Sequence, residues 1–155
     1  MHRSDDRQDP RLGEAVLELA GFISDPRQDW RMMAEAGLDL DPAFLPLLVR
    51  LGAGGPSKVV ELAEQLGRDH STMSRQISRL EAAGLVERTG SATDGRVRTA
   101  SVTARGQEAV AALSAARRRL LDRALADWAA ADREALARLL GKFANSLKTA
   151  ASESP

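Results

Sequence analysis

The sequence contains no cysteine, only two histidines, and five aromatic residues among 155. Without cysteine the chain has no disulfide, no thiolate metal cluster and no thiol that could sense peroxide. His2 and His70 are too few for a dedicated zinc site, and neither has neighbours that suggest a nucleophile with its base. A glycine loop that would cradle phosphates is also missing. We therefore expect no metal, no cofactor and no enzymatic activity.

Long apolar segments are absent as well. The sequence has no run of 18 or more apolar residues and no signal-type N-terminus. These absences predict a cytoplasmic protein without a membrane partner. The length of 155 residues leaves room for one domain with a sizeable hydrophobic core.

The most informative segment is 59–103, which has the pattern helix, turn, longer helix and hairpin. The spacing predicts a first helix over 59–66, and Gly67 can take the positive φ that a helix-ending turn requires. Asp69 is positioned to cap the second helix, which we expect to end at Gly84.

The second of these helices has two contrasting sides. Met73, Ile77 and Leu80 repeat at helical spacing and form one apolar stripe, which we expect to face the core. The other side carries small or basic residues, namely Ser71, Thr72, Ser74, Arg75, Ser78, Arg79 and Ala82. Short side chains let a helix enter a major groove about 12 Å wide, where arginine can bond guanine O6 and N7 or a phosphate. This side is therefore predicted to contact double-stranded DNA.

A hairpin is predicted after this helix. Segments 86–89 and 97–102 are rich in β-branched residues, and the turn formers of 90–96 separate them. Arg96 lies at the hairpin tip, where an extended arginine is attracted by the negative potential of a minor groove. Arg98, on the second strand, completes the predicted basic contacts.

In combination, these segments resemble the MarR (multiple antibiotic resistance regulator) family. The matching residues are 61–67, 71–75, Ile77, 80–81, 84–88, 94–96 and 102–106. The resemblance implies a dimeric winged-helix repressor that leaves DNA, or changes its affinity, when a small molecule or an oxidant binds. It further implies that the longer helix enters the major groove, that Arg96 enters the minor groove and that Asp94 helps to hold the wing. An effector would bind between the winged domain and the dimer helices.

Two segments depart from the family pattern. The usual capping Ser or Thr at the start of the first motif helix is replaced by Lys58, preceded by Ser57, which predicts a cap shifted by one residue. Pro26 interrupts what is commonly one long first helix, because proline removes a backbone donor and disfavours helix at the residue before it. We expect a kink, or a break in which Ser24 or Asp25 caps a new helix.

The predicted fold is mainly α with a small β-wing. N-terminal dimerisation helices occupy 1–40, the winged helix-turn-helix DNA-binding region 41–105, and C-terminal dimerisation helices 106–155, in one compact domain per chain. Helical repeats outside the motif comprise Leu12 to Ile23, Trp30 to Ala36, a segment opened by Asp41 and Pro42, a long helix capped by Thr103 over about 104–129, and a final helix beginning at Asp132.

The terminal helices carry more apolar surface than the winged motif can cover, which predicts a homodimer. Two recognition helices related by a two-fold axis would meet successive major grooves about 34 Å apart, on an imperfect palindrome. The alternative is a monomer in which these helices fold back on their own domain.

The formal charge is zero but unevenly distributed. Residues 1–67 hold 7 basic and 12 acidic side chains, residues 68–105 hold 7 and 4, and residues 106–155 hold 8 and 6, giving −5, +3 and +2. The positive excess thus coincides with the motif and favours phosphate contact there.

Several alternatives stay open at this level. His70 is either a surface residue or a pH switch. The cluster Arg117, Arg118 and Arg119 with Arg123 either touches DNA flanks or forms a solvated or intersubunit salt-bridging face. Trp30 and Trp128 either line a cleft for an aromatic ligand or pack in a core or interface. The whole winged helix is either a DNA-binding transcriptional regulator or a protein-interaction module without DNA affinity.

Overall fold

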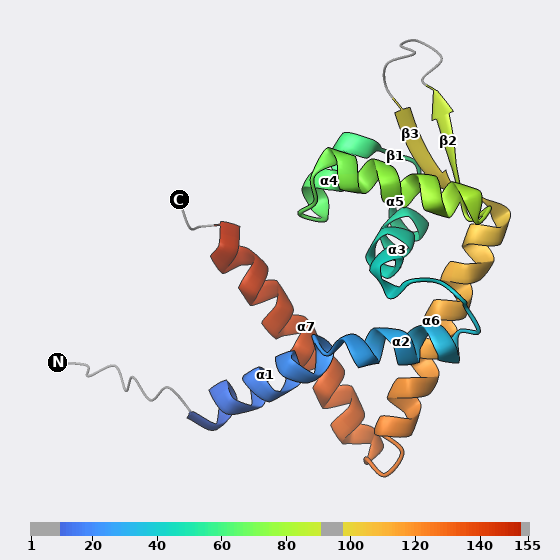
Figure 1. Ribbon diagram of the computed structural model, residues 1–155. Helices are drawn as coiled ribbons and strands as arrows, with labels where there is room; N and C mark the ends of the chain where they lie inside the picture. The colour runs from blue at the N-terminus through green and yellow to red at the C-terminus, as the bar shows by residue number, and fades with distance from the viewer. Residues whose placement is uncertain (1–9, 91–97, 153–155) are drawn as a thin grey trace. The chain divides into compact units, whose positions relative to one another are not determined.

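The computed structural model describes residues 10–90 and 98–152, which are mostly helical (Figure 1). The chain forms two compact units, residues 1–117 and 118–155. Within the described ranges, no helix has both the length and the apolar content needed to cross a membrane. The elements in chain order are α1 (Pro10–Ile23), α2 (Pro26–Glu35), the 3-10 helix η1 (Pro42–Phe44), α3 (Leu45–Gly54), β1 (Ser57–Lys58), α4 (Val59–Gln65), α5 (His70–Ala82), β2 (Val86–Gly90), β3 (Arg98–Val102), α6 (Ala104–Ala124) and α7 (Ala130–Ser152).

The core of the first unit lies between α3, α4, α5 and the sheet (Figure 1). The stripe of Met73, Ile77 and Leu80 is completely buried, as its helical spacing predicted. It meets apolar side chains of the neighbouring elements, including Phe44, Leu47, Leu48, Leu51, Val59, Leu62, Leu85, Val86, Ala100 and Ala109. Because one side of α5 is fixed in this core, its opposite side is directed away from it.

The wing is a three-stranded antiparallel sheet in the order β1-β3-β2. Val86 pairs with Val102 and Thr89 with Thr99, so the two predicted strands are confirmed. The third strand, β1, pairs Ser57 with Ala100 and was not predicted. A strand of two residues is too short to show the alternation by which strands are recognised.

The turn between α4 and α5 closes as the sequence predicted. Gly67 has a φ of 60°, in the left-handed region that favours glycine. The Arg68 N–H donates to the Ala63 carbonyl at 2.9 Å, which satisfies a carbonyl at the end of α4. Asp69 then caps α5 by accepting from the Thr72 N–H at 2.8 Å.

The two departures from the family pattern have different outcomes. Asp25 does cap a new helix after the Pro26 break, accepting from the Arg27 N–H at 3.0 Å. The predicted shift of the α4 cap is wrong, because Lys58 is the N-cap residue and provides no side-chain cap. The Ser57 hydroxyl instead donates to the Gly55 carbonyl at 3.2 Å.

The boundary between α6 and α7 also differs from the prediction. The long helix ends at Ala124 instead of about Ala129, and α7 begins at Ala130 instead of Asp132. The Arg133 guanidinium donates to the Ala126 carbonyl at 3.1 Å and stabilises the turn between them. Asp132 lies in the first turn of α7, where a carboxylate complements the positive helix end.

The start of α6 is tied closely to the end of α5. Thr103 caps α6, as predicted: its hydroxyl accepts from the Gly106 N–H at 3.0 Å and donates to the Gly84 carbonyl at 2.7 Å. A Cβ on Gly106 would overlap the Leu85 carbonyl oxygen, so only glycine fits at this crossing.

We expect Gly106→Ala to lower the free energy of unfolding by about 3 kcal/mol, because the added methyl group forces backbone apart. Gly141→Ala is the matched control: it lies inside α7 and its Cβ would have no atom within 4 Å. That change should raise stability by about 0.5 to 1 kcal/mol through helix propensity. Denaturant unfolding measures both, and an unchanged midpoint for Gly106→Ala would refute the close crossing.

Candidate nucleic-acid interface

The predicted contact residues of α5 lie together on the side opposite its buried stripe. Ser71, Arg75, Ser78 and Arg79 are exposed, and Thr72 and Ser74 are half-buried. The structure thus brings all six onto one continuous polar surface, which we call the α5 outer face and to which the exposed Ala82 also belongs. No acidic or large apolar side chain of α5 interrupts it.

Asp69 organises the beginning of the α5 outer face. Its carboxylate accepts from the Ser71 hydroxyl at 2.5 Å, from the Thr72 hydroxyl at 2.6 Å and from the Thr72 N–H at 2.8 Å. The hydroxyl bonds, followed by the backbone bond, hold the pKa of Asp69 well below its ordinary value. Asp69 is therefore ionised at neutral pH and acts only as an acceptor.

Arg88 organises the middle of the same face from the wing side. One terminal nitrogen, Nη1, donates to Ser78 Oγ at 3.1 Å and pairs with Glu81 Oε2 at 3.0 Å. The other, Nη2, donates to the Ser74 carbonyl at 2.7 Å and to Ser74 Oγ at 3.2 Å. All four terminal N–H groups are thus engaged within the protein, and the side chain is only 16% exposed.

No role was predicted for Arg88 from the sequence. One signal was available: Val86 and Arg88 alternate with the exposed Glu87 and Thr89, so Arg88 belongs to the inward side of β2. Its backbone N–H also donates to Glu81 Oε1 at 3.2 Å. These contacts fasten β2 to α5, so the wing and the α5 outer face are held as one piece.

The two exposed arginines of α5 border a shallow hollow beside η1. Its volume is about 230 Å³, and Arg75 and Arg79 line it together with Gln76. Gln76 Nε2 donates to the Ala43 carbonyl at 3.4 Å, which links α5 to η1. Arg75 Nη2 donates weakly to Thr72 Oγ1 at 3.3 Å. Both guanidinium groups are therefore positioned by α5 with little intramolecular restraint.

The wing candidates are only partly placed. Asp94 and Arg96 lie outside the described residues, so their predicted roles stay predictions. Arg98 belongs to β3 and pairs with Gly90 across the hairpin, and its side chain is outside the described part of the structure.

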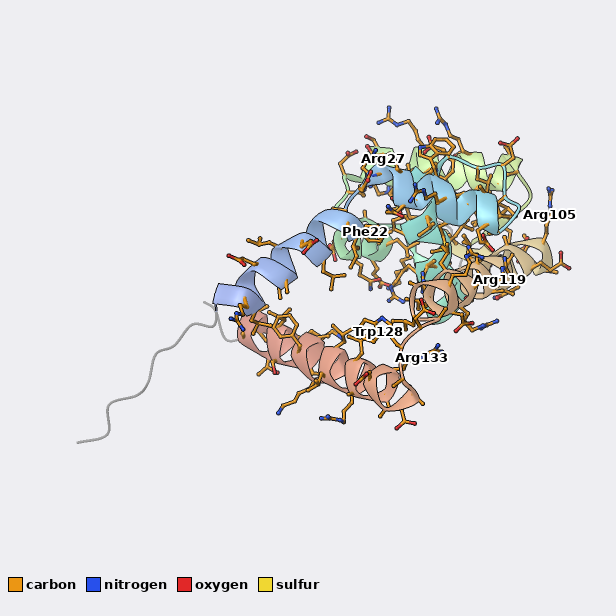
Figure 2. The ribbon with its side chains drawn as sticks, turned by 90° about the horizontal axis from the view of Figure 1, so that it is seen from below. Phe22, Arg27, Arg105, Arg119, Trp128 and Arg133 are labelled. Carbon is orange, nitrogen blue, oxygen red and sulfur yellow. The ribbon has the colours of Figure 1, made fainter. Side chains whose placement is uncertain are left out.

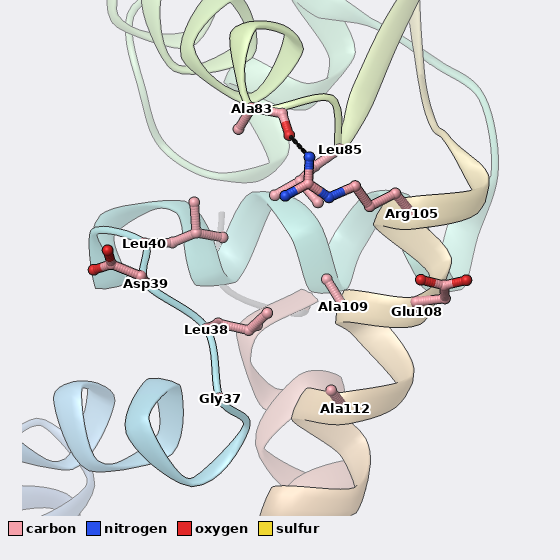
Figure 3. A pocket seen from close by; sticks show the side chains of 10 residues that line it. All are labelled: Gly37, Leu38, Asp39, Leu40, Ala83, Leu85, Arg105, Glu108, Ala109 and Ala112. Atoms are coloured by element: carbon pink, nitrogen blue, oxygen red, sulfur yellow. Dashed lines mark hydrogen bonds between the residues drawn. The ribbon is translucent and has the colours of Figure 1, made fainter.

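A cavity of about 450 Å³ lies between segment 37–40, the residues that follow α5 and the start of α6 (Figure 3). The Arg105 side chain extends from α6 and donates to the Ala83 carbonyl at 3.0 Å (Figure 3). The remaining lining residues are Gly37, Leu38, Asp39, Leu40, Leu85, Glu108, Ala109 and Ala112. The cavity thus adjoins Ala83, the C-cap residue of α5.

Large apolar side chains are exposed on α1 and α7, which flank the sequence of the winged region. Phe22 on α1 and Trp128 before α7 are labelled in Figure 2, and their exposed fractions are 59% and 46%. Trp30 is also exposed, so neither tryptophan packs in the core of the single chain. The other exposed apolar residues of these two helices are Leu12, Leu17, Leu19, Ile23, Leu139, Leu140, Phe143 and Leu147.

Other candidate residues from the sequence are exposed to solvent. His70 is exposed at the first position of α5, and Arg117 and Arg118 are exposed on α6. Within 10–90 and 98–152, no group of three histidine or carboxylate side chains is arranged to hold a metal ion.

Comparisons with known proteins agree with this geometry. Residues 38–97 match a family model described as the MarR family. An uncharacterized HTH-type transcriptional regulator of Bacillus subtilis, YxaD, is 36% identical over 105 residues, which cover 68% of this chain and 73% of that protein. The crystal structure of RV1404 from Mycobacterium tuberculosis is similar with a TM-score of 0.76 and 25% identity, over 93% of this chain and 97% of that one. A probable transcriptional regulator from Pseudomonas aeruginosa has a TM-score of 0.60 and 29% identity, over 91% and 99%.

Proposed function

Because the chain belongs to the MarR family of transcriptional regulators, we propose that it is a ligand-responsive repressor that binds a palindromic DNA operator as a homodimer. The observation that carries this proposal is the α5 outer face. It presents hydroxyls and arginines on a helix whose opposite side is locked in the core by Met73, Ile77 and Leu80. A rigid helix of this kind fits the major groove, where its arginines can reach guanine or phosphate.

The distribution of charge supports the same orientation. Residues 68–105 hold 7 basic and 4 acidic side chains, whereas residues 1–67 hold 7 and 12. Two of the four acids, Asp69 and Glu81, are engaged by Ser71, Thr72 and Arg88. The phosphate backbone would therefore be attracted to the wing and α5 and repelled by the N-terminal third.

The exposed apolar faces of α1 and α7 support the homodimer. α7 buries none of its side chains in the single chain, although it has 23 residues. Apolar residues in such number on a surface indicate an interface, and a second copy of the same helices is the partner that symmetry supplies.

The cavity beside Arg105 is the candidate effector site. Arg105 and Ala83 both line the cavity, and the Arg105 guanidinium donates to the Ala83 carbonyl, at the C-terminal end of α5. A small molecule that displaces this bond would act directly on the helix that carries the DNA contacts. It can regulate binding only if it prefers one position of α5 over another.

The direct experiment is titration of the protein with mixed genomic DNA at low and moderate salt. A repressor that neutralises phosphates should bind with an affinity that falls steeply as salt rises. A winged helix that serves only as a protein-interaction module would show no binding at either salt concentration, and that result would refute the proposal.

Arg75→Ala tests the base-reading part of the proposal. We expect the variant to bind its preferred site about 1 to 3 kcal/mol more weakly and to prefer a different base at one position of each half-site. The loss of its weak bond to Thr72 should leave folding unchanged. Binding selection with wild type and variant in parallel measures the preference, and unchanged affinity with unchanged preference would exclude Arg75 as a reader.

A further inference from the structure

The hydroxyl groups of the α5 outer face differ in whether their protons are free. A serine or threonine hydroxyl has one proton to donate and two lone pairs that accept. Ser71 and Thr72 both donate their protons to Asp69. Ser78 donates its proton to the Ser74 carbonyl at 3.0 Å. These three hydroxyls therefore have only lone pairs left for a ligand.

Ser74 is the opposite case. Its Oγ accepts from Arg88 Nη2 at 3.2 Å, and among the described residues no protein group takes its proton. A guanidinium cannot accept a hydrogen bond, so Arg88 leaves that proton available for a donor bond outward. For Ser71 the partner is a carboxylate, which can only accept. The Ser71 proton is therefore directed toward Asp69, away from a ligand.

We propose that Asp69 and Arg88 fix the hydrogen-bond polarity of the α5 outer face, so that Ser71 reads DNA as an acceptor and Ser74 as a donor. This inference rests on the proposed function and names the chemical groups recognised. Ser71 would accept from an exocyclic amino group, adenine N6 or cytosine N4. Ser74 would donate to guanine N7 or O6, adenine N7 or thymine O4.

The polarity has a second consequence for docking. Phosphate oxygens are acceptors only, so the Ser71 hydroxyl, whose proton is held by Asp69, cannot donate to the DNA backbone. Releasing its proton would break a bond to a charged acceptor, and such bonds are about twice as strong as neutral ones. The Ser71 hydroxyl should therefore face base edges, while the arginines provide the side-chain contacts to phosphate.

The test combines serine variants with base analogues in the selected operator. Every base pair carries both amino and acceptor groups, so the natural preference alone does not identify the atom that is read. Ser71→Ala first identifies the base pair that Ser71 contacts, as the position where preference relaxes. Replacing that pair's adenine by purine, or its cytosine by pyrimidin-2-one, then removes the amino group.

For the wild type we expect the loss of this amino group to weaken binding about fivefold to tenfold, as one hydrogen bond would. For Ser71→Ala it should cost nothing further. At the position that Ser74→Ala identifies, binding should instead weaken when an acceptor is removed from the base. The analogues that remove it are 7-deazapurine for N7, 2-aminopurine for guanine O6, and an analogue of thymine without O4.

Arg88 is a positioning residue in this proposal, and Arg88→Met tests that role. The methionine keeps an apolar side chain but cannot donate to Ser74 Oγ. The Ser74 hydroxyl should then no longer discriminate between acceptor and amino groups on the base. Arg88→Lys, which retains a cationic donor, should restore it. A residue that only stabilised the wing would weaken binding to all analogues equally, and thermal unfolding of both variants checks the fold.

The inference is overturned if Ser71→Ala relaxes the base preference at no operator position. It is also overturned if binding at the position that Ser71→Ala identifies depends on N7 or O4 and not on the amino group. It is likewise overturned if Arg88→Met keeps the analogue dependence of Ser74. Failure of wild type to select any DNA sequence would overturn the proposed function, and this inference with it.

Discussion

Arg79→Glu is expected to lower operator affinity more than a hundredfold at moderate salt. Arg79 is exposed on the α5 outer face, in the last turn of α5. The substitution removes a contact to phosphate or guanine and places a carboxylate against the DNA. A like charge at an interface costs several kcal/mol, and about 1.4 kcal/mol corresponds to a factor of ten. Fluorescence anisotropy of a labelled operator over a salt series measures the effect.

Arg138→Glu is the matched control for that experiment. Arg138 is exposed on α7 and undergoes the same change of charge. If the loss of affinity came only from net charge, both variants would lose it equally. Equal losses, or an Arg79→Glu protein that binds as wild type, would contradict the assignment of the α5 outer face.

The second large effect is expected from Phe143→Asp on α7. Phe143 is 41% exposed in the single chain, so the substitution should leave the fold of one chain intact. In a dimer the new carboxylate would be buried against apolar side chains, which is strongly unfavourable. Sedimentation should show a species near the 16.6 kDa of one chain in place of one twice as heavy. Operator affinity should fall by a factor of about 10² or more, because two linked half-site contacts become independent.

Lys142→Asp provides the comparison on the same helix. Lys142 is exposed next to Phe143 in sequence but lies off the apolar stripe that Leu140, Phe143 and Leu147 form at helical spacing. Lys142→Asp changes the net charge by more than Phe143→Asp does, yet the dimer should persist. A wild-type protein that sediments as a single chain at micromolar concentration would remove the premise of both variants.

Much of this architecture could be predicted from local sequence signals. Glycine at position 67, a capping aspartate at 69 and apolar spacing from Met73 to Leu80 define the motif, and each acts within a few residues. The α5 outer face could be predicted from the same helical spacing, because the side of a helix that is buried determines which residues lie on the opposite side. Its polar residues could therefore be named without coordinates.

The interactions that cross the fold could not be predicted in this way. Arg88 reaches Ser74 across 14 residues, and nothing in the spacing of either segment specifies that pairing. The two-residue β1 forms only because β3 offers it a partner at Ala100. In the turn after α6, the Ala126 carbonyl accepts from Arg133, which follows the last residue of α6 by nine positions. Such features depend on tertiary contacts, which local propensity does not encode.

We expect the α5 outer face to read DNA in a symmetric pair. Selection of bound fragments from a random DNA pool by the wild-type protein should recover an imperfect palindrome whose half-sites are centred about one helical turn, or 34 Å, apart. Recovery of fragments with no shared sequence, or of a single unpaired half-site, would refute a symmetric pair of reading helices.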